Sequence, residues 1–427
     1  LKAKSNKKSD IYFYSLELNL IKKDGVPYDR HYGAPISEKN ESGLSASYLL
    51  NLSNNYIEIL NPYKYHKKIN RLLSTIDSNV IVLDSYLKLT DIISVHAGIF
   101  KIYCKFLIAK RRNDFNKSFF VNGVSCRDIL VPELEQSFYG GFQSSLLSSI
   151  QFFNWSNEQN QKLTIVSYLE TLSAARSIYY FGRKSVSKCT FIGLQHSTIY
   201  RNKIDFYNRR KEFNYSYQGG IEFSPQPDYY LLHGQYSKDL IQEFMDIDRL
   251  KIIGCLKFDN FPLVLSKIEK IKKKVISQLE FKNRYIVVLA PSFGVDIDGM
   301  LNLFKDIKYD SNKIKFIISP HPLVSVDEIS NKILKMGISN KFDFYPNIST
   351  QEIIIAADLV VCGYSSIALE SVIFKTHSVR VVQKQEIPMF EDEDPVQYIT
   401  SKKEFWDYIY TSIEEDRKNN FLEENKK

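Results

Sequence analysis

Leu359-Val-Val-Cys-Gly-Tyr-Ser-Ser-Ile-Ala-Leu-Glu370 joins an apolar run to a glycine turn and a helix start. The run Leu359–Val361 has the length and β-branched content of a strand buried on both faces of a parallel sheet. The turn offers the hydroxyls of Ser365 and Ser366 and the N–H groups of a helix start, which together favour an anion. Glu370, one turn further, is placed to contact ribose hydroxyls. The alternative is an ordinary capped helix without a ligand.

The same alternation of short apolar runs with helical segments extends along the chain, as expected for βαβ units around parallel sheets. The runs predicted as strands are Ile11–Leu18, Tyr56–Leu60, Asn79–Leu83, Leu163–Tyr168, Thr190–Leu194, Tyr229–Leu232, Lys251–Ile253, Tyr285–Leu289, Lys315–Ile318, Lys341–Tyr345, Leu359–Val361 and Ser378–Val382. The fold class is therefore predicted to be α/β, with doubly wound Rossmann-like domains.

A Lys-rich segment that begins at Asn260 interrupts this rhythm, and 427 residues exceed what one hydrophobic core usually organises. We expect a first domain at residues 1–259, a linker and helix at 260–282, a second domain at 283–402, and a C-terminal helix with a frayed tail at 403–427. Ligands of open α/β sheets bind beyond the carboxyl ends of the strands, so two facing domains predict a central cleft as the active site.

Composition excludes several classes of protein. With 44% apolar and 25% charged residues the chain is globular, neither disordered nor collagen-like. The net charge of +8 is too diffuse for a nucleic-acid binder, but it suits anionic ligands or a membrane face. Five cysteines without a CxxC pair indicate reduced thiols in the cytoplasm. No apolar stretch approaches about 20 residues, so no membrane-spanning helix is expected.

Strand ends of the second domain carry further unusual residues. Lys315–Ile318 runs into Ser-Pro-His321-Pro322, where the two prolines hold a histidine rigidly toward the crevice. A capped loop histidine is the alternative. Ser292 follows Tyr285–Leu289 in a loop of small residues that permits close approach of a ligand. Two aspartates in that loop are expected to be solvated, so no metal site is predicted. Neither a Walker motif nor a GxGxxG follows any strand.

Strand ends of the first domain supply candidates for acid–base chemistry. His196 follows Thr190–Leu194, and Glu170 follows Leu163–Tyr168. Lys257 and Asp259 follow the last strand before the break, where a cation suits phosphate or carboxylate and a carboxylate suits the reacting carbon. The alternatives are a structural histidine, a helix-start acid and an interdomain salt bridge.

Several of these motifs resemble those of GT-B glycosyltransferases. Ser-Pro-His321-Pro322 and Gly-Tyr-Ser365-Ser366 are similar to the His-Pro and Ser/Thr motifs of bacterial sialyltransferases and Kdo transferases, which use CMP-activated sugars. The stretch from Glu170 to Asp259 resembles retaining β-Kdo transferases of surface-polysaccharide synthesis, and Asp29-Arg-His-Tyr-Gly33 matches loosely.

Two departures bear on the related families. The stretch around Ser365 also resembles CDP-glycerol glycerophosphotransferases of teichoic acid synthesis, but His196 is followed by serine where those enzymes carry His-Gly. The acidic triplet of many inverting sialyltransferases is not evident near Glu170.

The resemblance implies a transferase that moves an ulosonic sugar from a CMP donor to a surface-glycan or lipid-linked acceptor, without a metal or other cofactor. Kdo is the leading candidate for this sugar. The donor-binding residues that the resemblance implies are Lys257, His321, Pro322, Ser365, Ser366 and Glu370, and the loop of small residues adds Ser292. If configuration is retained, Asp259 is the nucleophile and Glu170 the acceptor base, with His196 assisting at the donor. If it is inverted, Glu170 or His196 is the base.

The alternatives are a CDP-glycerol-type glycerophosphotransferase, an inverting sialyltransferase and a non-catalytic glycan- or nucleotide-binding module. We expect a cytoplasmic protein, at the inner face of the plasma membrane if Lys2–Lys8 and Lys267–Lys274 add a weak attraction to anionic lipid.

Overall fold

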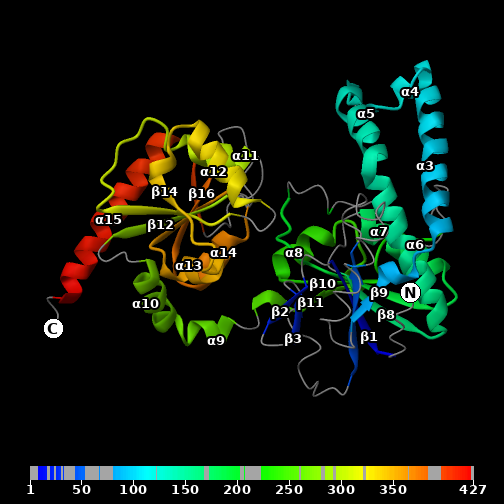
Figure 1. The fold of residues 1–427 in the computed structure, drawn as a ribbon, viewed down its shortest axis with the longest axis horizontal. Coiled ribbons are helices and arrows are strands. Elements are labelled where there is room, and N and C mark those ends of the chain that lie inside the picture. Colours follow the sequence, from blue (N-terminus) through cyan, green and yellow to red (C-terminus); the bar gives the residue numbers. More distant parts are fainter. Residues whose placement is uncertain are drawn as a thin grey trace. The chain divides into compact units, whose positions relative to one another are not determined.

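The computed structural model describes residues 8–16, 20–23, 26–29, 32, 44–52, 67, 80–121, 123–167, 173–201, 206, 223–258, 261–279, 284–291, 295–320, 324–363, 365–382 and 396–424. The chain divides into two compact units (Figure 1). Unit 1 comprises residues 1–199 and 203–259, and unit 2 comprises residues 200–202 and 260–427.

Unit 1 is built on a seven-stranded sheet in which every pairing is parallel. Its strands, from one edge to the other, are β11 (Leu250–Ile252), β10 (Tyr229–Leu232), β9 (Cys189–Leu194), β8 (Leu163–Ser167), β1 (Ile11–Leu16), β4 (Ala46–Asn51) and β5 (Val80–Val82). The chain starts at the central strand β1, winds outward to β5, and then winds outward the other way from β8 to β11. This is the doubly wound order of Rossmann-like domains.

The strands predicted for this unit are confirmed within two residues at each end, except Tyr56–Leu60, which lies outside the described residues. Strand β4 escaped the prediction because its polar residues obscure the apolar run. Both of them are buried and bonded: the Ser47 hydroxyl lies 2.7 Å from that of Ser9, and the Asn51 amide donates to the Tyr14 hydroxyl at 2.6 Å.

Aromatic side chains fill the core of unit 1. Tyr12 and Trp155 meet edge to face with ring centroids 5.1 Å apart, and Phe152 and Phe191 pack beside them.

Helices and two short antiparallel hairpins complete the described part of unit 1. In chain order they are β2 (Leu20–Lys23), β3 (Val26–Asp29), the 3-10 helix Leu83–Tyr86, α3 (Leu89–Ala109), α4 (Asn113–Lys117), β6 (Phe120–Val121), β7 (Val124–Ser125), α5 (Arg127–Gln136), the π-helix Ser137–Gly141, α6 (Phe142–Gln159), α7 (Ser173–Lys184), α8 (Gln235–Ile241), and the 3-10 helices Ile247–Arg249 and Leu256–Phe258.

Gly182 of α7 faces this aromatic cluster. A Cβ at this position would overlap the rings of Phe191 and Phe152. Glycine therefore allows α7 to approach the sheet closely enough to cover both rings.

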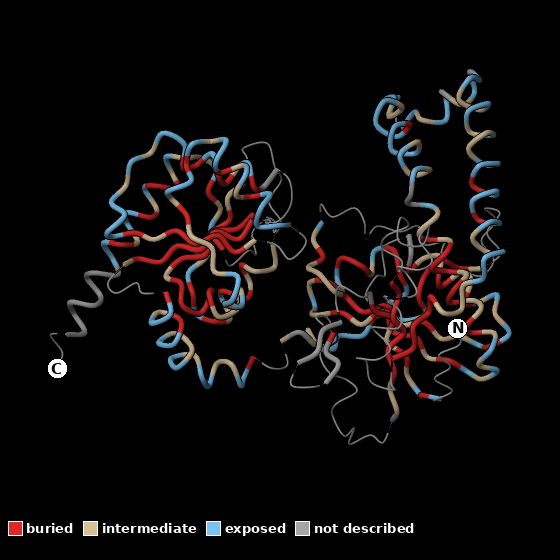
Figure 2. Tube along the Cα trace, viewed as in Figure 1, coloured by how far each residue is buried: buried red, intermediate tan, exposed pale blue. Residues whose placement is uncertain are grey.

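Helices α3, α4 and α5 extend away from the sheet of unit 1 (Figure 1), and much of their surface is exposed (Figure 2). Among the described residues, α3 is the helix that has the length and composition to cross a membrane. Only 11% of its most apolar 18-residue stretch is buried. This corrects the expectation that no such helix exists. The expectation failed because Asp91, Lys101 and Lys105 interrupt an otherwise apolar helix without making it polar on average.

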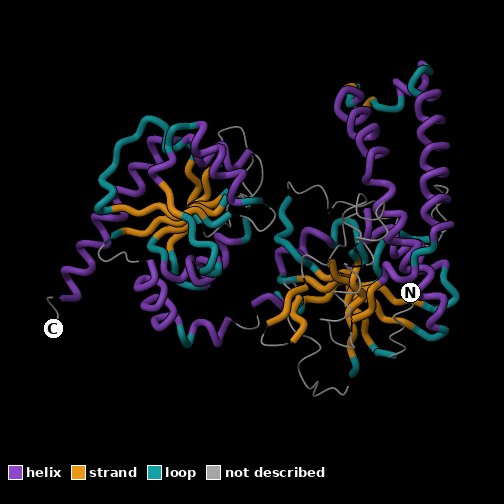
Figure 3. Tube along the Cα trace, viewed as in Figure 1, coloured by secondary structure: helices purple, strands orange, loops and turns teal. Residues whose placement is uncertain are grey.

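Unit 2 contains a six-stranded parallel sheet with helices packed around it (Figure 3). Its strands, in order across the sheet, are β14 (Phe342–Asp343), β13 (Ile314–Ile318), β12 (Tyr285–Ala290), β15 (Leu359–Cys362), β16 (His377–Val381) and β17 (Gln397–Ile399). Numbered along the chain this order is 3-2-1-4-5-6, that of the Rossmann fold. The predicted strands are confirmed within two residues, and the short β17 was not predicted. The predicted class, α/β with two doubly wound Rossmann-like domains, is confirmed.

The helices of unit 2 are α9 (Phe261–Leu265), α10 (Ile268–Leu279), α11 (Val295–Asn302), α12 (Val326–Lys335), the 3-10 helix Ser339–Lys341, α13 (Thr350–Ala356), α14 (Ile367–Ile373) and α15 (Lys402–Glu424). Helices α9 and α10 pack on this unit: Lys274 of α10 pairs with Glu352 of α13 at 2.9 Å, and the ring of Phe261 lies 4.6 Å from that of Phe374. The first turns of α15 enter the core through Phe405 and Trp406.

Candidate functional site

Each sheet has one place where the strand order reverses, and ligands of doubly wound sheets bind beyond the strand ends at this switch point. In unit 2 the switch point lies between β12 and β15, where Ala290 pairs with Cys362. The loop that begins at Pro291 and the turn from Gly363 to Ser366 therefore leave the sheet side by side. The sequence analysis predicted ligand-binding residues in both segments.

A buried arginine holds the turn that follows β15. Arg380 of β16 pairs with Cys362 and has no exposed surface. Its Nη1 atom donates to the carbonyl oxygens of Gly363 and Ser365, each at 2.9 Å. Two charge-assisted bonds from one guanidinium fix this turn against the sheet. The sequence analysis did not select Arg380, although a charged residue in an otherwise apolar strand was the available signal.

The two serines of the turn have different surroundings. The Ser365 hydroxyl accepts a hydrogen bond from the N–H of Ile367 at 3.3 Å, so it caps the helix. Ser366 occupies the N-cap position of α14, as predicted, but its side chain makes no capping hydrogen bond. Its half-buried hydroxyl is available to a ligand. Glu370 is only 9% exposed, so of the three residues it offers the least surface.

Strand β13 is the neighbour of β12, and Ile318 at its end pairs with Leu289 of β12. Ser319 is buried, its N–H donates to the Leu289 carbonyl at 2.9 Å, and its hydroxyl lies 2.9 Å from that of Thr350. These bonds fix the chain where it enters the Pro-His-Pro motif. His321, Pro322 and Ser292 lie outside the described residues.

Two histidines in unit 1 follow neighbouring strands. His196 comes after β9 and His233 after β10, and the two strands are adjacent and parallel. Gln195 is 2% exposed and bonds to both segments: its Oε1 accepts from the N–H of His233 at 2.8 Å, and its Nε2 donates to the Ser197 carbonyl at 2.9 Å. The sequence analysis selected His196 but passed over His233, although its place at the next strand end was a usable signal.

The switch point of unit 1 lies between β1 and β8 and has a buried carboxylate. Asp29 has no exposed surface, and it accepts hydrogen bonds from the Ser15 hydroxyl and from the N–H of Tyr32 at 3.0 Å. The Tyr32 hydroxyl donates to the carbonyl of Tyr14 in β1 at 2.9 Å. The motif that begins at Asp29 thus anchors the chain at the central strand of unit 1.

The remaining candidates of unit 1 are not brought together. Glu170 and Asp259 lie outside the described residues. Lys257 lies in the 3-10 helix Leu256–Phe258, and its side chain is not described. Their predicted roles stay predictions.

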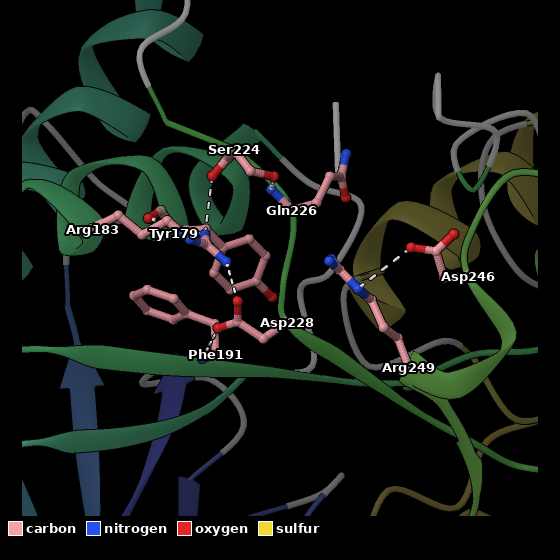
Figure 4. A network of polar contacts seen from close by, with 8 residues as sticks. All are labelled: Tyr179, Arg183, Phe191, Ser224, Gln226, Asp228, Asp246 and Arg249. Atoms are coloured by element: carbon pink, nitrogen blue, oxygen red, sulfur yellow. Dashed lines mark hydrogen bonds and ion pairs between the residues drawn. The ribbon is translucent and has the colours of Figure 1, made fainter. Parts of the chain in front are cut away.

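Asp228 belongs to a structural network (Figure 4). Its carboxylate pairs with Arg183 of α7 at 2.8 Å and accepts from the N–H of Phe191 at 2.8 Å. Arg183 also donates to the Ser224 carbonyl at 3.0 Å and lies over the Phe191 ring. The network ties α7 to β9 and so supports the strand that leads to His196. In the same view, Arg249 and Asp246 form a looser pair at 3.8 Å.

The sequence matches no protein-family profile and no curated protein. Among solved structures, the chain is similar to a variant of the wall teichoic acid polymerase TagF, with 16% identity over 56% of this chain and a TM-score of 0.34. It spans 55% of the length of that polymerase. It is also similar to HepE from Anabaena in complex with UDP and glucose, with 14% identity over 63% of this chain and 72% of that chain and a TM-score of 0.41.

A glycosyltransferase from Rickettsia africae shows 12% identity over 67% of this chain and 78% of that chain, with a TM-score of 0.40. At these values the similarities assign neither activity nor substrate, and the fold rests on the two sheets themselves.

Proposed function

We propose that this protein is a GT-B glycosyltransferase that transfers an ulosonic sugar from a CMP donor to a surface-glycan or lipid-linked acceptor. Kdo is the leading candidate for this sugar. The observation that carries the proposal is the switch point of unit 2. A Gly-x-Ser-Ser turn lies there, a buried guanidinium holds it rigidly, and the Ser366 hydroxyl is left without a capping role. The His-Pro and Ser-Ser motifs that resemble CMP-sugar enzymes follow, in the sequence, two strands of this sheet, β13 and β15.

In this proposal unit 2 binds the nucleotide. Ser366 donates to the phosphate, which carries the developing charge as CMP leaves, and a preorganised donor at that place lowers the barrier. Arg380 is a positioning residue, because it acts through the carbonyl oxygens of the turn. Ser292, His321 and Pro322 complete the phosphate site and Glu370 approaches the ribose, as the motif resemblance implies.

Unit 1 supplies the acceptor side and the acid–base groups. Retention of configuration requires a carboxylate that attacks the anomeric carbon and a second group that deprotonates the acceptor. We assign Asp259 to the first role and Glu170 to the second, with His196 assisting and Lys257 meeting the sugar carboxylate. Intact-protein mass spectrometry of a trapped glycosyl adduct tests the nucleophile. An Asp259→Asn variant with near-normal turnover would contradict it.

The donor is identified by incubating the protein separately with CMP-Kdo, CMP-sialic acid and CDP-glycerol and measuring the nucleotide released. We expect release from CMP-Kdo, and a strong reduction in Ser366→Ala. The matched control is Ser277→Ala in α10, whose hydroxyl bonds only to a carbonyl of its own helix. Release from CDP-glycerol alone indicates the glycerophosphotransferase, and release from CMP-sialic acid alone the sialyltransferase. No release and no nucleotide binding would leave the non-catalytic module.

The proposed chemistry needs no metal, since the donors around the phosphate are protein groups. Turnover is therefore expected to be unchanged when EDTA is added to the assay. Loss of turnover on EDTA that is restored by a divalent cation would contradict this part of the proposal.

A further inference from the structure

The helical arm is defined here as residues 89–136, with α3, α4, the β6–β7 hairpin and α5. It carries 11 of the 24 large apolar side chains that are exposed among the described residues. It projects from the sheet of unit 1 (Figure 1), and most of its residues are coloured as exposed or intermediate (Figure 2). No part of the proposed chemistry uses it.

Helix α3 has two apolar faces where a soluble surface helix needs only one. The inner face carries Val95 and Ile99, which are buried against Leu147 of α6. The outer face carries Leu89, Ile93, Phe100 and Leu107, which are 72%, 61%, 68% and 38% exposed. Their spacing of four, seven and seven residues places them in one stripe along the helix.

The apolar surface continues beyond α3. In the hairpin and in α5, Phe120, Val124, Ile129 and Leu130 are all more than 40% exposed. Soluble monomers rarely leave so many large apolar side chains uncovered, so we expect a partner that covers the arm.

The charge of the arm indicates what that partner is. The whole arm contains seven basic and five acidic residues, a net charge of +2, and this charge is unevenly distributed. Residues 101–127 contain all seven basic residues and one acidic residue, a net charge of +6. The basic residues are Lys101, Lys105, Lys110, Arg111, Arg112, Lys117 and Arg127. Apolar and basic side chains interleaved on one element match a bilayer with anionic headgroups. Two copies of the chain that met through the segment 101–127 would bring like charges together.

We propose that the arm docks the protein on an anionic lipid surface, with the outer stripe of α3 inserted among the acyl chains and the basic residues at the headgroups. Lys101 and Lys105 lie on a neighbouring face of α3, so their stems reach back to the headgroup level. The arm lies in the interface rather than spanning, because a spanning α3 would place Lys101 and Lys105 in the hydrocarbon. The full chain without nucleotide sugar suffices to test this, so the outcome is independent of the proposed transfer.

The test is co-sedimentation of the full chain with vesicles of phosphatidylcholine alone and of phosphatidylcholine with phosphatidylglycerol. We expect binding to the anionic vesicles only, reduced about tenfold or more by Ile93→Glu with Phe100→Glu, and similarly by Lys101→Gln, Lys105→Gln, Arg111→Gln and Arg112→Gln together. The apolar control is Val186→Glu with Leu334→Glu, two side chains 77% and 67% exposed outside the arm. The basic control is Lys308→Gln with Lys335→Gln, two exposed lysines of unit 2 outside the arm. Both controls should bind as the wild type does.

Equal binding of the arm variants and the wild type, or no binding of the wild type to anionic vesicles, would overturn the proposal. Sedimentation velocity tests whether the arm instead binds a second copy of the chain. If the wild type does not bind vesicles and forms a dimer that Phe100→Glu dissociates, the arm is a dimer interface. The substituted side chains are exposed, and unchanged thermal unfolding of each variant verifies that it is folded.

Discussion

Arg380 donates a hydrogen bond from Nη1 to the backbone carbonyl of Ser365 at 2.9 Å, although the two residues are 15 positions apart. The same nitrogen atom reaches the carbonyl of Gly363 at 2.9 Å. A side chain without exposed surface therefore determines where the Ser365–Ser366 turn stands at the switch point of unit 2. The predicted phosphate ligands depend on a residue that cannot contact bulk solvent.

Replacing Arg380 by Met should destabilise unit 2 by about 3 kcal/mol, because two carbonyls lose a charged donor in a buried site. Calorimetric unfolding measures this loss. As a positioning residue, Arg380 should also affect KM for the donor more than kcat when the folded fraction is assayed. Arg249→Met is the matched control, since Arg249 pairs loosely with Asp246 at 3.8 Å on the surface. A normal KM in folded Arg380→Met would reduce the role to stability alone.

The two serines of the turn should separate stability from binding. Ser365→Ala removes the acceptor of the Ile367 N–H and should cost about 0.5–1 kcal/mol of stability. Ser366→Ala removes no capping bond and should leave stability within about 0.5 kcal/mol, while CMP affinity falls about tenfold. Urea unfolding and calorimetric titration of both variants check the pattern. The reverse pattern would move the proposed phosphate ligand to Ser365.

The Arg183–Asp228 pair should behave as a buried ion pair. Its side chains are 7% and 22% exposed, and Asp228→Ala leaves a guanidinium inside unit 1 without its carboxylate. The expected loss of stability is about 3 kcal/mol. Asp246→Ala, which breaks the exposed pair with Arg249, should cost less than about 1 kcal/mol. Equal losses of unfolding free energy in the two variants would contradict a larger contribution of the network in Figure 4 to stability.

Gly182 and Gly98 provide a matched pair of glycine substitutions within helices. An added methyl at Gly182 overlaps Phe191 and Phe152, whereas at Gly98 of α3 it meets nothing within 4 Å. Gly182→Ala should therefore destabilise unit 1 by about 1–3 kcal/mol. Gly98→Ala should stabilise the arm by about 0.5–1 kcal/mol, because alanine favours helix. Thermal unfolding followed by circular dichroism distinguishes the two directions.

Stability should depend on pH through Glu352. The hydrogen bond from Lys274, together with those from Ser349, lowers its pKa below the ordinary value of 4.5. Its contribution is therefore complete above about pH 4.5 and is lost as pH falls through the lowered pKa. Lys274→Met should reduce stability by about 0.5 kcal/mol at pH 7, and the difference from the wild type should close in acid. A difference that stays constant down to pH 3 would contradict this pairing.

How far the sequence predicts this protein depends on the kind of element. Strands such as Tyr285–Ala290 consist of buried apolar residues on both faces, so their runs are visible without any tertiary information. Strand β4 is equally buried but contains Ser47 and Asn51, whose bonding partners come from distant parts of the chain. Their burial could not be predicted before those partners were known.

The candidate site shows the same limit. Ser366 at a helix start was predictable from local sequence, because strand, turn and helix adjoin in the chain. For Arg380 the local sequence offers only a charge within an apolar strand, and its role at the turn depends on the pairing of β16 with β15. His233 gains its place beside His196 only through the pairing of β10 with β9. The exposure of α3 was equally invisible, since its apolar pattern fits a buried helix as well as an exposed one.

The central claim is that the switch point of unit 2 binds a CMP-activated sugar, and calorimetric titration of CMP tests it most directly. We predict one CMP bound per chain in the wild type, and an affinity about tenfold weaker in Ser366→Ala with unchanged unfolding. No heat of binding with the wild type, or equal affinity in the two proteins, would contradict the account.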